Sequence, residues 1–87
     1  MGHIEFLQKV YDSEINFSIS TFWDAGFDVK LGDKLNGFLA EKTGLRDMAD
    51  VCKEIEIMIL EHYPESEIAA LITNRYHTSY TFGGSDA

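Results

Sequence analysis

Hydrophobic and polar residues alternate along residues 15–43, which is the pattern of strands that bury one face. In the segment INFSISTFW, every second residue from Ile15 to Trp23 falls on one side of an extended chain, and the intervening positions are polar apart from Phe22. Residues 27–31, FDVKL, alternate in the same way. The pattern predicts a three-stranded antiparallel meander with one face toward a core.

The sequence WDAGF predicts a tight first hairpin, because Asp24 can bond the backbone just ahead and Gly26 tolerates a positive φ. We expect Trp23 and Phe27 to pair across this hairpin. In an alternative interpretation, Phe22 and its neighbours form an exposed recognition patch, because Phe22 lies on a face otherwise filled by serine and asparagine.

Two turns are open for the second hairpin. A four-residue loop, Asp33–Asn36, would place Leu31 opposite Phe38, whereas a two-residue turn at Asn36-Gly37 would place Leu35 opposite Phe38. We favour the longer loop because it keeps Asp33 off the apolar face.

Two helices are predicted beside the meander. Residues 2–14 place Ile4, Leu7 and either Val10 or Tyr11 at helical spacing. Residues 43–63 form the longest predicted helix, with Thr43 as its N-cap and Pro64 ending it. Its core-facing stripe is Met48, Val51 or Cys52, Ile55, Met58 or Ile59, and Tyr63.

Ile57 and Leu60 lie outside this stripe, so the helix is more apolar than one sheet contact requires. They indicate either a broad core contact or a second interface, most simply a homodimer seam.

The fold class expected is α+β, in the order helix, three strands, helix, with both helices on one face of the sheet and a C-terminal extension. Ser66 is the expected N-cap of a further short helix, and residues 1–75 form one domain. Residues 76–87 alternate Tyr76, Thr78, Tyr80 and Phe82, which is typical of a fourth strand or of an arm lying on another subunit.

Composition narrows the classes of function. Hydrophobic residues make up 45% of the 87, and the formal net charge is −8 with a pI near 4.6. This charge repels phosphate backbones and anionic membranes, so it argues against nucleic acid and membrane partners; it favours a basic partner or serves solubility alone. A single cysteine, with no leader or membrane span in the sequence, predicts a cytoplasmic protein.

No catalytic, metal or cofactor signature is present. The histidines His3, His62 and His77 lack partners at ligand spacing, and Cys52 falls within an apolar stripe. The glycines are spaced as turn residues and not as a phosphate loop. We therefore expect a protein that is not an enzyme and that has no small-molecule substrate.

The order helix, three strands, helix over residues 3–63 resembles that of double-stranded RNA-binding domains. That family binds phosphates through a lysine-rich start of its last helix, whereas Leu45–Lys53 here carries two basic and two acidic residues. Residues 24–60 are also similar to HicB-type antitoxins, a resemblance that implies inhibition of a protein partner. The positions that carry it are Asp24, Gly26, Phe27, Val29, Thr43 and Ala49.

Three functions follow as hypotheses. The first is a non-enzymatic protein–protein interaction module, homodimeric, and the second is an acidic inhibitor that blocks a basic site. The third is a double-stranded RNA binder. The candidate partner-binding residues are Phe22, Trp23, Phe27, Ile57 and Leu60.

Overall fold

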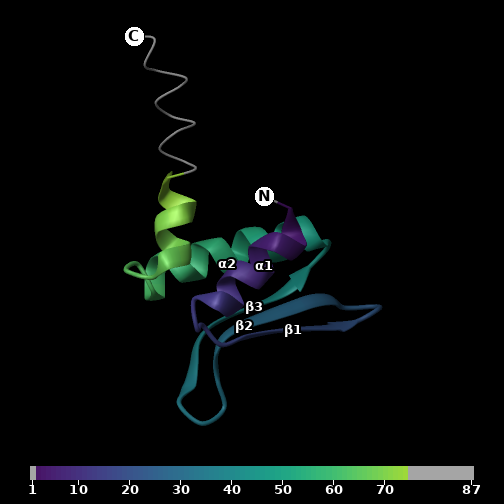
Figure 1. The fold of residues 1–87 in the computed structure, drawn as a ribbon. Helices are drawn as coiled ribbons and strands as arrows, with labels where there is room; N and C mark the ends of the chain where they lie inside the picture. The colour runs from purple at the N-terminus through teal and green to yellow at the C-terminus, as the bar shows by residue number, and fades with distance from the viewer. Residues whose placement is uncertain (1, 75–87) are drawn as a thin grey trace.

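The computed structural model describes residues 2–74. The chain runs through α1 (His3–Asp12), β1 (Phe17–Phe22), β2 (Gly26–Asp33), β3 (Gly37–Leu45) and α2 (Met48–His62), followed by a helix at residues 67–74. The strands form one antiparallel sheet in the order β1-β2-β3, and α1 and α2 lie on the same side of it (Figure 1). The α+β prediction is confirmed. The expected arm, residues 76–87, lies outside the described residues.

The core lies between the sheet and the helices. Val29 and Leu31 of β2 are fully buried, and α2 packs across β2 and β3 while α1 packs against α2. Burying this apolar surface is what holds the short elements together, since neither a lone hairpin nor α1 would be stable in water. The other buried apolar side chains are Phe6, Val10, Ile15, Val51, Cys52, Ile55, Met58, Ile59, Ile68, Ala69 and Ile72.

The inward face of α1 matches the prediction in part. Phe6 and Val10, four residues apart, are its buried side chains, whereas Ile4 and Tyr11 are exposed. Leu7 is partly buried against the core, so Leu7 and Val10 of the predicted face are borne out, with Phe6 added to them and Ile4 outside the contact.

The start of α2 also differs from the prediction. Thr43 belongs to β3, and the N-cap is Asp47, whose Oδ1 accepts a hydrogen bond from the N–H of Asp50 at 2.9 Å. A carboxylate at this position satisfies an otherwise unpaired helix N–H and suits the helix dipole. The predicted stripe of α2 is confirmed, and the helix ends at His62, before Pro64.

Ser66 caps the last described helix, as predicted. Its Oγ accepts from the N–H of Ala69 at 3.1 Å and donates to the carbonyl of Tyr63 at 2.8 Å. The N–H of Ile68 donates to Ser13 Oγ at 3.2 Å, which ties this helix to the end of α1. Ile68 and Ile72 complete the core from this side.

Both registers considered for the second hairpin are wrong. Asp33 lies opposite Gly37 and Leu31 lies opposite Ala40, which leaves a three-residue loop. The register shifts at Gly32, whose φ is +104° and whose backbone is close to that of Phe38. This irregularity absorbs one residue, so neither regular pairing could match it.

Candidate interaction surface

The tip of the β1–β2 hairpin is built by its backbone. Phe22 lies opposite Gly26, the N–H of Ala25 donates to the carbonyl of Phe22 at 2.8 Å, and Gly26 has a φ of +84°. This is a type of turn in which three loop residues precede a glycine in the left-handed region. The hydroxyl of Thr21 adds a hydrogen bond to the carbonyl of Gly26 at 3.0 Å.

Two aromatic side chains at this tip face solvent. Trp23 is 95% exposed and Phe22 is 70% exposed. The expected pairing of Trp23 with Phe27 is wrong, because Thr21 lies opposite Phe27. Trp23 is a loop residue, so the alternation of the strand does not carry it inward, whereas Phe27 is half-buried against the core. Exposed large aromatic residues of this kind are typical anchors of protein interfaces.

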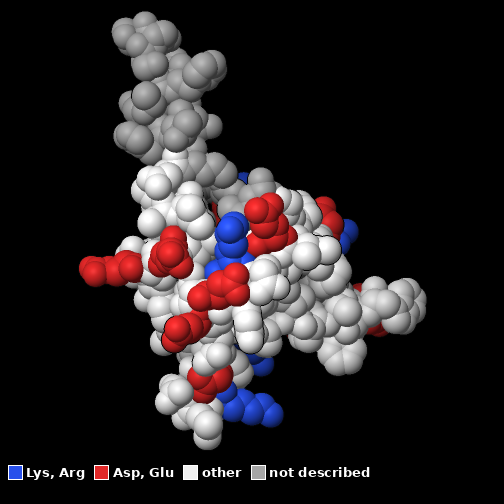
Figure 2. Space-filling model, viewed as in Figure 1, with Lys and Arg blue, Asp and Glu red and all other residues white. Residues whose placement is uncertain are grey.

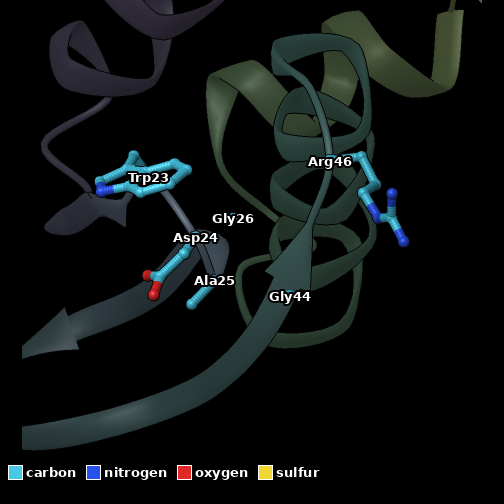
Figure 3. Close-up of a pocket in the computed structure, with 6 residues that line it drawn as sticks. All are labelled: Trp23, Asp24, Ala25, Gly26, Gly44 and Arg46. Atoms are coloured by element: carbon cyan, nitrogen blue, oxygen red, sulfur yellow. The ribbon is translucent and has the colours of Figure 1, made fainter.

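A hollow of about 450 Å³ lies between this tip and the end of β3 (Figure 3). Figure 3 shows the indole of Trp23 on one side and Arg46 on the other, with the Asp24 carboxylate and the Arg46 guanidinium pointing in different directions. The charged groups therefore do not converge on one point, as an acid–base pair would require. The remaining lining residues are Ala25, Gly26 and Gly44.

The structure does not bring the predicted site residues of α2 to the hairpin tip. Ile57 is 48% exposed on α2, and Leu60 is half-buried at the margin of the core. Leu60 thus fits the expectation of a broad core contact, and Ile57 remains exposed on the helical layer, where Ile4, Tyr11 and Leu71 are also exposed. Phe22 and Trp23 are the members of the predicted set that lie next to each other and face solvent.

Cys52 is buried within the core, as its place in the apolar stripe indicated. Burial raises the pKa of its thiol, and the nearby carboxylate of Glu56 raises it further. A raised pKa keeps the thiol protonated and unreactive. The burial of Glu56 itself was not predicted, because a charged residue on a helix usually lies on the solvated face.

Acidic side chains gather around the helical layer, where few basic ones accompany them (Figure 2). They come from both helices and from the segment that follows α2. Such a surface favours contact with a basic partner and opposes contact with phosphate. The residues are Glu5, Asp12, Asp50, Glu54, Glu61, Glu65 and Glu67.

The chain matches no protein-family model, and comparisons with curated proteins and with solved structures also gave no match. Within residues 2–74, no helix has both the length and the apolar character needed to cross a bilayer. The case for a function therefore rests on the geometry of this surface.

Proposed function

We propose that the protein is a non-enzymatic protein–protein interaction module that self-associates and contacts its partner through the tip of the β1–β2 hairpin. The observation that carries the proposal is the near-complete exposure of Trp23 beside exposed Phe22. Each of these side chains gains stabilisation from burial that the folded monomer does not supply. The turn beneath them is held by backbone hydrogen bonds, so the aromatic side chains are presented on a preorganised support.

Leu35 offers a matched control for this proposal. It is also 95% exposed and lies at the tip of the second hairpin. Chains carrying Trp23→Ala or Leu35→Ala, used as bait beside the wild type, should behave differently. We expect the Trp23→Ala bait no longer to retain the protein that the wild-type bait retains, and the Leu35→Ala bait to retain it. Equal retention by both variants would remove the hairpin tip as the contact.

A second candidate function is inhibition of a protein that has a basic site. The acidic helical layer supports it (Figure 2), and the HicB-type resemblance suggests the same action. Binding of this kind weakens steeply with ionic strength, because it depends on charge and not on apolar burial. A partner whose affinity is unchanged between low and high salt would contradict this candidate and favour the hairpin tip.

Binding to double-stranded RNA is the third candidate, suggested by the order of helices and strands. The start of α2 works against it, because Asp47 caps the helix and Asp50 lies in its first turn. Both carboxylates stand where a phosphate would approach the helix. A gel shift with duplex RNA at low salt tests this candidate, and we expect no shift.

A further inference from the structure

β1 leaves one of its two backbone edges without a partner strand in the described sheet. It is the first strand in the order β1-β2-β3 and pairs with β2 alone. The N–H of Gly32 donates to the carbonyl of Asn16 at 2.8 Å, so Asn16 faces β2. Backbone groups alternate along an antiparallel strand. The N–H and C=O groups of Phe17, Ile19 and Thr21 therefore point away from β2.

The two edges of the sheet are protected very differently. β3, at the other edge, carries Glu41 and Lys42, contains glycines with positive φ, and pairs with β2 through two register shifts. Charges and irregularities of this kind discourage another strand from adding to an edge. β1 has none of them, because no residue from Ile15 to Trp23 is charged or a glycine, and β1 pairs with β2 without a register shift.

The charge of the whole chain restricts what can approach this edge. At a net charge of −8, two copies repel each other over most of their surfaces. The stretch from Ile15 to Trp23 is a neutral strip through which they can meet, with acidic residues, Glu14 and Asp24, only at its two ends. This strip is also rich in β-branched and aromatic residues, which suit strand pairing.

We infer that β1 pairs antiparallel with β1 of a second copy, with the two-fold axis at Ile19. The inference rests on the proposed function and names its partner and its contact. With this axis, Ile19 lies opposite Ile19 of the second copy, and Phe17 lies opposite Thr21 of the second copy. All outward-facing groups of both strands are then satisfied, which adds about six backbone hydrogen bonds.

The helical layer leaves room for this pairing. α2 packs across β2 and β3, and α1 packs against α2. Phe17 and Ile19 are only half-buried, so their side chains gain cover when a second β1 lies beside them. A two-fold axis perpendicular to the sheet keeps the helices of both copies on one side of a continuous sheet.

The same register gives the exposed hairpin tip a place to bind. Phe22 falls beside Asn16 of the second copy, and Trp23 follows it along the chain. Asn16 borders a shallow hollow of about 430 Å³, whose rim includes the exposed ring of Tyr11. The indole of each copy is thus brought to the hollow of the other, where two exposed aromatic side chains bury each other. The remaining lining residues are Asp12, Glu14 and Ile15.

Sedimentation of the full chain over a range of concentrations tests the pairing. Thr21→Pro removes an outward N–H without removing a hydrogen bond to β2, because proline is tolerated at such edge positions. Thr21→Val is the matched control, since both variants lose the side-chain bond to Gly26. We expect Thr21→Pro to weaken the dimer by roughly tenfold or more and Thr21→Val by less than about threefold.

Disulfide cross-linking tests the register independently of that variant. Ile19→Cys places two thiols on the two-fold axis, where opposed Cα atoms are about 5.5 Å apart and can be bridged. Thr21→Cys places them about 13 Å apart along the strands, beyond disulfide reach. The native Cys52 is buried and present in every variant, so it gives a constant background. We expect oxidation to trap a dimer of Ile19→Cys and not of Thr21→Cys.

The outcomes separate this inference from the proposed function. A wild-type chain that stays monomeric at every concentration, or a Thr21→Cys variant that cross-links as fast as Ile19→Cys, overturns the two-fold pairing at Ile19. The bait experiment with Trp23→Ala and Leu35→Ala does not depend on that pairing. Its failure overturns the hairpin tip as a contact, whatever the oligomeric state.

Discussion

The two hairpins of this sheet have the same type of turn but expose different side chains. Each has three loop residues followed by a glycine in the left-handed region, with φ of +84° at Gly26 and +87° at Gly37. The second tip is tied down by polar side chains around Asp33, whereas the first carries exposed Phe22 and Trp23. One turn type therefore presents different side chains at the two tips, aromatic Phe22 and Trp23 at the first and aliphatic Leu35 at the second.

Replacing Gly26 by alanine should have the largest effect on this comparison. A Cβ at Gly26 would overlap the carbonyl oxygen of Leu45 in the neighbouring strand, in addition to the strain of a positive φ. Strain and forced displacement of backbone together cost on the order of 3–4 kcal/mol. We expect Gly26→Ala to lower the free energy of unfolding in urea by that amount. A loss below about 1 kcal/mol would show that β3 can move away without cost.

Gly37→Ala isolates the backbone contribution at the second hairpin. No atom lies within 4 Å of a Cβ built at Gly37, so only its positive φ opposes a side chain. The expected loss in the free energy of unfolding is about 1–2 kcal/mol, measured in the same urea titration. A loss equal to that of Gly26→Ala would contradict the assignment of the larger effect to the contact with Leu45.

These glycines also show how far the sequence predicts the fold. Period-two alternation predicted the three strands, and helical spacing with Pro64 predicted the stripe and end of α2. The register of the second hairpin could not be read, because the shift at Gly32 depends on backbone proximity to Phe38 that alternation does not encode. The N-cap was misplaced because both Thr43 and Asp47 have suitable side chains, and only packing decides between them.

The candidate surface was predictable in part for the same reason. Phe22 interrupts a polar face, and that signal pointed to the exposed position it occupies. Trp23 continued the apolar alternation and was expected to pair with Phe27, but it lies beyond the last strand residue, where alternation no longer determines direction. Ile57 and Leu60 looked equivalent by spacing, yet the margin of the core reaches Leu60 and leaves Ile57 half-exposed.

The carboxylate of Asp33 gives the second hairpin a dependence on pH. Its pKa lies below the usual value, first because the backbone N–H of Asn36 donates to it at 2.8 Å, and then because the side chains of Asn36 and Asn16 do so. A lowered folded-state pKa contributes stability above the unfolded value of 3.8, and this is lost as the pH falls through the folded-state pKa.

We therefore expect the difference in the free energy of unfolding between the wild type and Asp33→Asn to shrink as the pH is lowered from neutral to below the folded-state pKa of Asp33. Urea unfolding of both proteins across the acid range measures it, and the other carboxylates cancel because both chains contain them. A difference that stays constant with pH would mean that the hydrogen bonds from Asn36 and Asn16 do not favour the ionised form of Asp33.

The smallest effect on stability is expected at the two exposed tips. Trp23 and Leu35 are each 95% exposed, so truncation to alanine removes almost no buried surface from the monomer. Both variants should have free energies of unfolding within about 0.5 kcal/mol of the wild type, measured by far-UV circular dichroism at the lowest usable protein concentration.

Raising the concentration should then separate the two variants, because stability gained by association depends on mass action. We expect the stability of Leu35→Ala to rise with concentration as that of the wild type does. The stability of Trp23→Ala should rise less, since in the two-fold pairing Trp23 is buried against the second copy. Equal behaviour of both variants at high concentration would make the two tips alike in function as well as in backbone.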